Sequence, residues 1–571
     1  MMAHYRRAAL GAGLILLAWL LPIEAIAPLM TGAKHADARL GLNILRVGLA
    51  VNGVFALVWA ASPPGWFRGL GMPADVAGLI SDQEAGGRDR RQPPWRALLL
   101  ILAVGAVLRL IGLNRDLWLD EIATVVGYLR LSPWQNLYAY DSSNQHLLYS
   151  LLGSLSLSLF GESAWAARLP AVLFGVGSLA ALYLLGRAVA PEREALLASA
   201  LMSASYHHVW FSQNARGYTG MLFFALMGTW LFLRGLTGNR TRAWAGYVVS
   251  MTAGNLILQQ TAFLFASHVT AYLLTLPQWP GWRARHGPLT RRVLAIAILV
   301  VLFSIQAHSL MLPRMIEFFR TEERPGLGIT DPAVFAQVLL RGLQTGFLGI
   351  GLLLGVLLLG SGWLSYWRQS PLVAGLLVLP PVFGVLAMLV LRYGAYPRAF
   401  LYVLPLSLLL VVRGAMEAGD WLARRLAPAG GWRRAAQSYL GLTIVGLMLA
   451  LSAVSLIYYY RYPKQDYTGA LAYVEANRSA DDTVAAVGQA AAPYEMYYAP
   501  GLAFPATPGE LAALEQPGRS VWILYSFPRD MRLWFSDLFD YMETHAELTA
   551  VFPGTLDDGN LYVARIDGMG R

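Results

Sequence analysis

Residues 371–391 read PLVAGLLVLPPVFGVLAMLVL, an apolar run that no charged residue interrupts. A helix needs roughly 17–25 such residues to cross the ~30 Å hydrocarbon core of a bilayer. Similar runs recur, and they predict spanning helices at 8–30, 42–61, 97–113, 164–187, 195–211, 218–236, 244–260, 261–277, 293–311, 345–366, 371–391, 399–415 and 437–457. The sequence therefore predicts an α-helical polytopic membrane protein with about 13 transmembrane helices.

The composition agrees with a membrane protein and excludes several kinds of site. The 571 residues are 56% hydrophobic and 14% charged, whereas a soluble protein carries roughly 25% charged residues. The absence of cysteine excludes disulfides, cysteine-ligated zinc and thiol nucleophiles. A divalent metal remains possible through His, Asp and Glu only. The net charge of +10 does not indicate a nucleic-acid partner, because membrane proteins gather Arg and Lys on their cytoplasmic side.

The distribution of basic residues predicts the orientation. Arg6 and Arg7 precede the first run, and the loops assigned inside hold about twice as many Lys and Arg as outer loops of similar total length. We therefore expect a cytoplasmic N-terminus. The shorter run Leu147–Phe160 is expected to lie at the outer interface, because a span there would place the arginine-rich loops outside. Residues 1–30 could also be a secretory signal peptide, but no clear cleavage site ends the run, which favours an anchor.

Three regions are expected. Residues 1–96 are a two-helix addition with a basic cytoplasmic loop, 97–457 form the transmembrane core with its outer loop 114–163, and 458–571 carry a net charge of −7. In the last region, helices are expected at 466–477 and 529–545, and strands at 483–487, 520–526, 548–552 and 560–566. These elements predict a small extracytoplasmic α/β domain. It has no glycine-rich phosphate loop.

The outer loop 114–163 holds the first candidate residues. Asp120 and Glu121 follow a predicted span, where a carboxylate can act as a general base. Alternatively, the pair only begins a helix, since acids complement the helix dipole there. Asp141 is a candidate for substrate binding. His146 could orient a substrate or bind a metal, or it could be a satisfied interface residue.

A second outer segment spans residues 211–218 and contains Gln213, Asn214, Arg216 and Tyr218. An arginine at an outer helix end runs against the positive-inside tendency, so a specific partner is expected for Arg216. Its paired N–H donors suit a lipid phosphate, and the other three residues are candidates for the same substrate site. The alternative is that Arg216 extends toward lipid headgroups.

A third outer segment, 392–398, includes Tyr396 and Arg398. The arginine suits a phosphate leaving group, and the tyrosine ring suits a sugar face. Interfacial Tyr and Arg are also ordinary residues of the membrane belt, so both interpretations stay open.

Several motifs follow one another in a specific order. They are 117–121 (LWLDE), 144–149 (NQHLLY), 160–163 (FGES), 167–175 (ARLPAVLFG), 184–187 (LLGR) and 212–218 (SQNARGY). This order resembles the GT-C superfamily of polyprenyl-phosphate-dependent glycosyltransferases. It is most similar to bacterial family 39-like members, which include protein mannosyltransferases, the lipid A aminoarabinose transferase and lipopolysaccharide-core galacturonosyltransferases. The resemblance covers about residues 97–415.

The resemblance implies catalytic roles for Asp120 and Glu121, which match the acidic pair of the family's first outer loop. The family's His-Pro-Pro-Leu-Tyr run is present as residues 146–149 without either proline. The acid that often stands in its second outer loop is replaced here by Gln213 and Asn214. This replacement weakens the case for a metal site built from two carboxylates.

Together these observations predict a glycosyltransferase of the bacterial inner membrane. It would move a hexosyl or pentosyl group from a polyprenyl-phosphate donor to a lipid, polysaccharide or protein acceptor on the outer face, with inversion. Asp120 would be the base, and Arg216 and Arg398 would stabilise the leaving phosphate. A transporter or flippase of lipid-linked sugars is an alternative, although its polar residues would gather near the midplane. A non-catalytic membrane scaffold of the same fold is another.

Overall fold

The computed structural model describes residues 2–32, 34–63, 66, 71–72, 95–278, 282–320, 329, 331–391, 396–426, 431–556 and 558–568. Most of the basic loop expected within 62–96 lies outside these residues, as do the first four positions of segment 392–398. The chain divides into two compact units. Unit 1 comprises Met1–Leu110, Ser132–Leu152 and Pro170–Ser455, and unit 2 comprises Ile111–Leu131, Gly153–Leu169 and Leu456–Arg571.

The membrane region of the protein is helical. Its longer helices are α1 (Met2–Leu20), α3 (His35–Ala61), α5 (Trp95–Leu110), α8 (Leu147–Phe160), α9 (Ala164–Val189), α10 (Glu192–Ser203), α12 (Tyr218–Gly238), α13 (Thr241–Ile257), α14 (Thr261–Thr275), α15 (Trp282–His308), α17 (Pro332–Gln369), α18 (Pro371–Leu391), α19 (Val403–Leu426) and α20 (Gly431–Arg461). Short helices include α2 (Ile23–Ile26), α6 (Leu119–Thr124), α7 (Pro133–Asn136), α11 (Tyr206–Ser212) and α16 (Leu312–Arg320). This is the expected α-helical polytopic architecture.

The number of spans was tested by the length and composition of the helices. Within the described ranges, six helices are long and apolar enough to cross a membrane, or seven if the bent pair Tyr5–Leu20 and Ile23–Leu29 forms one span. The count of about 13 therefore stays a prediction. The run expected at the outer interface is a helix with the expected bounds, α8.

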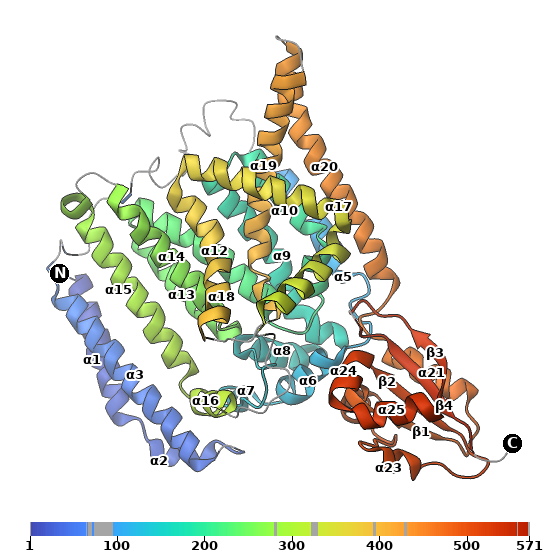
Figure 1. Ribbon diagram of the computed structural model, residues 1–571. Helices are drawn as coiled ribbons and strands as arrows, with labels where there is room; N and C mark the ends of the chain where they lie inside the picture. Colours follow the sequence, from blue (N-terminus) through green and yellow to red (C-terminus); the bar gives the residue numbers. More distant parts are fainter. Residues whose placement is uncertain are drawn as a thin grey trace. The chain divides into compact units, whose positions relative to one another are not determined.

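Close packing of small residues joins the first two long helices in unit 1. In Figure 1, α1 and α3 run side by side. A Cβ atom placed on Gly53 would lie 2.7 Å from the carbonyl oxygen of Gly11, and one on Gly11 would lie 2.7 Å from that of Gly53. Facing glycines let two helix backbones approach closely, which favours helix association in membranes where hydrophobic burial contributes little.

One predicted span, 195–211, is wrong as a single helix. The chain breaks at Ala204 and Ser205, so that α10 ends at Ser203 and α11 begins at Tyr206. The Ser205 hydroxyl accepts the N–H of His208 as a helix cap. Arg109, fully buried, donates to the carbonyls of Ser203 at 3.1 Å and Met202 at 3.4 Å. The guanidinium thus satisfies carbonyls that a continuous helix would have bonded internally.

Unit 2 contains a four-stranded mixed sheet in the order β1-β2-β4-β3. The strands are β1 (Thr483–Ala486), β2 (Val521–Ser526), β3 (Glu547–Phe552) and β4 (Leu561–Ile566). β1 is parallel to β2, and β4 is antiparallel to both of its neighbours. Helix α21 (Tyr467–Asn477) contacts β2, β3 and β4, and α25 (Ser536–His545) packs into the sheet core with α23 (Pro508–Ala512) and α24 (Pro528–Trp534). The predicted α/β domain is confirmed, with strand bounds within a residue or two.

The predicted helix 529–545 is wrong as a continuous element. It divides into α24 and α25 at Phe535, where the backbone leaves the helical region with φ −135°. The Phe535 ring packs against the sheet core. The sequence pattern of residues 529–545 does not indicate this break between the two helices.

Candidate active site

The acidic pair begins helix α6 in unit 2. Adjacent residues of a helix differ in direction by about 100°, so the two carboxylates have different surroundings. Glu121 is completely buried, and Asp120 is only partly buried. The Asp120 carbonyl accepts the hydroxyl of Thr124 at 2.8 Å, which is a bond within the helix. The expectation that the pair starts a helix is confirmed, and the two acids can have different roles.

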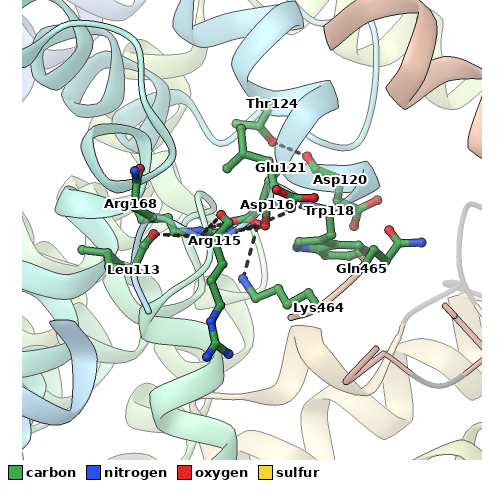
Figure 2. A network of polar contacts seen from close by, with 12 residues as sticks. Leu113, Arg115, Asp116, Trp118, Asp120, Glu121, Thr124, Arg168, Lys464 and Gln465 are labelled. Carbon is green, nitrogen blue, oxygen red and sulfur yellow. Dashed lines mark hydrogen bonds and ion pairs between the residues drawn. The ribbon is translucent and has the colours of Figure 1, made fainter. Parts of the chain in front are cut away.

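Glu121 is held by several donors (Figure 2). Arg168 of α9 contacts both carboxylate oxygens, with Nε to Oε1 at 2.8 Å and Nη2 to Oε2 at 2.6 Å. Lys464 Nζ lies 3.4 Å from Oε2. The backbone N–H of Trp118 donates to Oε2 at 3.3 Å. Since all of these groups are buried, Glu121 is the acceptor of a buried ionic cluster.

Arg168 also fixes the chain that leads to the acidic pair. Its guanidinium donates to the carbonyls of Leu113, Arg115 and Asp116, each at 2.8 Å. One side chain thus bonds both to Glu121 and to the preceding turn (Figure 2). In the sequence, Arg168 stands in the motif 167–175, near the start of the predicted span 164–187. Its bidentate pairing with Glu121 was not predicted.

Lys464 is the functional candidate that the sequence reasoning missed. Its side chain is 4% exposed, and burial lowers its pKa to about 7, with Glu121 opposing and Arg168 adding to this shift. The signal in the sequence that could have identified Lys464 is its residue type, because lysine is rare in this chain. Arg and Lys together number 44, but Lys34 and Lys464 are the two lysines of the chain.

The second group of candidates lies in unit 1 and centres on His146. This residue is 1% exposed, and its ring packs edge-on against Tyr218 with centroids 5.5 Å apart. The N–H of Gly217 donates to Nδ1 at 2.7 Å. Burial, and then the charges of Arg216 and Arg398, hold the pKa of His146 well below its usual range, so the ring is neutral. A neutral ring whose Nδ1 accepts must carry its proton on Nε2.

The Nε2–H of His146 is therefore a buried donor. Among the described residues, none accepts a hydrogen bond from it. A buried donor without an acceptor costs about 1–3 kcal/mol, and here two cations lie within electrostatic reach of the ring. This combination favours an anionic acceptor.

The two cations come from the other predicted segments. Arg216 is 2% exposed and lies over the Tyr218 ring at 5.2 Å. Arg398 is partly exposed in the 3₁₀ turn Pro397–Phe400, and lies 4.5 Å from the centroid of the Tyr396 ring. The structure thus gathers His146, Arg216 and Arg398 within unit 1, although more than 250 residues separate the first from the last along the chain.

The remaining predicted residues differ in their surroundings. Gln213 is buried and donates to the carbonyl of Arg109 at 2.8 Å, which favours a structural role. Asn214, two positions before Arg216 in the sequence, is fully buried. Asp141 has a side chain 74% exposed and pairs with Arg314 at 3.7 Å, so it belongs to the surface. In the described part of the chain, no three His, Asp or Glu side chains gather as a metal would require.

Comparison with known proteins finds a family match for part of the chain. The model of dolichyl-phosphate-mannose-protein mannosyltransferases matches residues 144–305. YkcB of Bacillus subtilis, which carries the name of a mannosyltransferase, is 22% identical over 239 residues, which are 40% of this chain and 32% of that protein. The chain thus aligns with about a third of that relative's length.

Two solved structures have a similar arrangement of elements. ArnT from Cupriavidus metallidurans, solved with undecaprenyl phosphate, is 12% identical, with a TM-score of 0.49 over 83% of this chain and 98% of ArnT. The oligosaccharyltransferase AglB from Archaeoglobus fulgidus is 12% identical, with a TM-score of 0.45 over 81% of this chain and 74% of AglB. The family match takes in most of the ordered motifs between residues 144 and 218, so this part of the chain is similar to the dolichyl-phosphate-mannose-protein mannosyltransferases.

Proposed function

We propose that this protein transfers a sugar from a polyprenyl-phosphate carrier to an acceptor at the outer face of the bacterial inner membrane. The observation that carries the proposal is the group of His146, Arg216 and Arg398. It offers a buried neutral N–H and two guanidinium groups, which together suit a phosphate. The family description names a polyprenyl-phosphate sugar as donor, which supports the same assignment.

The chemistry is a direct displacement. The acceptor hydroxyl or amine loses its proton to a carboxylate, its oxygen or nitrogen bonds to the anomeric carbon, and the bond from that carbon to the phosphate oxygen breaks. The configuration inverts, and the polyprenyl phosphate leaves with one more negative charge. We assign the stabilisation of that charge to Arg216 and Arg398, with a hydrogen bond from His146 Nε2–H.

Asp120 is the proposed base. Glu121 already accepts from Arg168, Lys464 and the backbone, and it is fully buried. Asp120 is partly exposed and adjacent to it. A base must be reachable by the proton that it removes, which favours Asp120.

The phosphate assignment is tested by binding of undecaprenyl phosphate to the purified full chain. Arg216→Ala and Arg398→Ala should each weaken binding about 10- to 100-fold, since a charge-assisted hydrogen bond contributes roughly 1.5–3 kcal/mol. Arg187→Ala is the matched control, because Arg187 also lies over a tyrosine ring, that of Tyr183 at 5.6 Å, but its side chain is 46% exposed. Equal affinities in all variants would remove the assignment.

His146→Asn isolates the contribution of Nε2. The asparagine amide oxygen can accept the Gly217 N–H near the position of Nδ1, but no donor remains at the position of Nε2. We expect a loss of binding of about 5- to 50-fold with the fold retained. Unchanged binding would show that the ring has only a structural role.

The assigned reaction is tested in cells. A deletion strain should lose one glycosylated lipid, polysaccharide or protein by mass spectrometry, and the wild-type gene should restore it. Asp120→Asn should accumulate in membranes without restoring the product. Full restoration by Asp120→Asn would reject the base, and a product unaffected by deletion would favour the non-catalytic scaffold.

A further inference from the structure

The loop before α6 receives its polar partners from a distant part of unit 2. Arg115 donates to the carbonyl of Tyr460 at 2.5 Å and to that of Tyr462 at 3.2 Å. Asp116 accepts the backbone N–H of Thr468 at 2.8 Å and its hydroxyl at 3.1 Å. These contacts join residues that are about 350 positions apart in the sequence.

The first turn of α6 is also completed from this segment. Trp118 occupies the N-cap position, where its indole offers no side-chain acceptor for the free N–H groups of the helix. The N–H of Leu119 instead donates to Gln465 Oε1 at 3.1 Å. Gln465 is itself fully buried, and Tyr467 donates its hydroxyl to the same oxygen at 2.9 Å. The chain that follows α20 therefore supplies one cap of α6, beside the bond from the Trp118 N–H to Glu121.

A further contact comes from the short helical segment Tyr494–Tyr498. The hydroxyl of Tyr498 donates to the carbonyl of Leu117 at 3.0 Å. Its ring stacks on that of Tyr467, with centroids 5.2 Å apart and an angle of 22° between the planes. Because Tyr467 also bonds Gln465, the two tyrosines connect the contact at Leu117 to the cap at Leu119.

Lys464 is the charged member of this set. It reaches Glu121, one residue after the proposed base, from a side chain that is 4% exposed. Burial of an ammonium group costs several kcal/mol, so it requires a specific partner. Apart from Lys464 itself and Lys34, which is exposed and paired with Glu317, every Lys or Arg position of the chain is an arginine. The ammonium group of lysine is compact and can pair with a single carboxylate oxygen, whereas the planar guanidinium group of arginine needs more room.

We infer that residues 460–498 act as a positioning element for the acidic helix α6, and that Lys464 is its principal positioning residue through Glu121. This inference rests on the proposed function, since it concerns the carboxylate assigned as base. Lys464 and Arg168 fix Glu121, Gln465 fixes the first N–H of the helix, and Asp120 lies between these two attachment points. The C-terminal domain is then part of the catalytic machinery and not only a covering domain.

Hydrogen exchange of the full chain in detergent tests the inference without any substrate. Lys464→Met should increase the exchange of amides in residues 115–124 about 10- to 100-fold, as expected when a buried charged contact is lost. Lys34→Met is the matched control, because the other lysine has an exposed ion pair, and it should leave these amides unchanged. Equal exchange of 115–124 in Lys464→Met and wild type would overturn the inference, whatever the protein is found to do.

A catalytic measurement separates positioning from simple stability. In Lys464→Met, undecaprenyl phosphate binding should stay within about twofold, while restoration of the deletion strain's product falls at least 10-fold at matched protein levels. Gln465→Asn shortens the side chain whose oxygen accepts the Leu119 N–H, so it should loosen α6 and lower the product in the same way. Normal product with loosened α6 would reject the positioning role. Failure of Asp120→Asn to lose product would reject the proposed base, and leave the exchange result standing.

Discussion

Replacement of Glu121 should mainly lower the stability of the protein, whereas replacement of its neighbour Asp120 should mainly abolish activity. In Glu121→Gln, the carboxylate that receives Arg168 at 2.6 and 2.8 Å and Lys464 at 3.4 Å is lost. Two buried cations then lack their counterion. Removal of one partner of a buried ion pair costs about 3–5 kcal/mol. Since 1 kcal/mol shifts Tm by roughly 2–4 °C in a unit of roughly 150–250 residues, we expect a loss of roughly 6–20 °C.

Asp120→Asn should instead leave the stability nearly unchanged. Its side chain is partly exposed, and the change preserves shape and the helix, so about 1 kcal/mol or less is expected. Activity should nevertheless disappear, because an amide cannot accept the proton of the acceptor. Thermal unfolding of purified protein in one detergent, with membrane yield beside it, measures the first difference. Product formation in the deletion strain measures the second.

Glu162→Gln provides the matched control for the buried pair. Glu162 also receives two bonds from one arginine, Arg130, at 2.7 and 3.1 Å, but both side chains are about 40% exposed. Exposed pairs contribute roughly 0–1 kcal/mol, so its Tm should fall by no more than a few degrees. The assignment of separate roles is refuted if the Tm of Glu121→Gln falls no more than that of Glu162→Gln. It is also refuted if the Tm of Asp120→Asn falls as far as that of Glu121→Gln.

Three further predictions concern Lys464, Arg109 and Gly53. The pKa of Lys464 is lowered to about 7 in the folded chain, against 10.5 when unfolded, with Glu121 and Arg168 as the charged groups that act on it. The unfolded state therefore binds more protons between these values, so stability should rise from about pH 7 to about pH 10 in denaturation series, and Lys464→Met should flatten that rise. Arg109→Met should lower the free energy of unfolding by about 3 kcal/mol or more, because the carbonyls at the end of α10 lose a buried charged donor. Tm and membrane yield should fall with it. Gly53→Leu should separate α1 from α3, since its Cβ would meet the Gly11 carbonyl at 2.7 Å, and cross-linking between the two helices should fall while a matched Gly13→Leu, which meets no atom within 4 Å, keeps it.

The sequence was most informative where local pattern decides structure. Apolar length placed most of the long helices, and alternation with turn residues placed the strands of the C-terminal sheet within one or two residues. It failed at the break near Ser205, where carbonyls at the end of α10 are bonded by Arg109, about 95 residues earlier. It failed at Phe535 for a similar reason, since the ring turns toward a core that only the folded sheet provides.

The candidate residues show the same limit. The motifs identified Asp120, Glu121, His146, Arg216 and Arg398 by type and position. They did not indicate that Glu121 and Asp120 have such different surroundings, because neither Lys464 nor its burial can be read from the acidic loop. The tautomer of His146 was equally hidden, as it depends on the N–H of Gly217, 71 residues away.

The ionic cluster also decides which acid can take a proton during transfer. If Glu121 accepted the proton of the acceptor, it would become neutral while the permanently charged guanidinium of Arg168 stayed beside it, 2.6 Å away and almost wholly buried. The protein would then hold uncompensated buried positive charge at the moment when the reaction needs its lowest barrier, a penalty of several kcal/mol. Protonation of Asp120 would leave the contacts of Arg168 and Lys464 with Glu121 in place. The proposed reaction therefore works best with Glu121 ionised, which supports our proposal that Asp120 takes the proton.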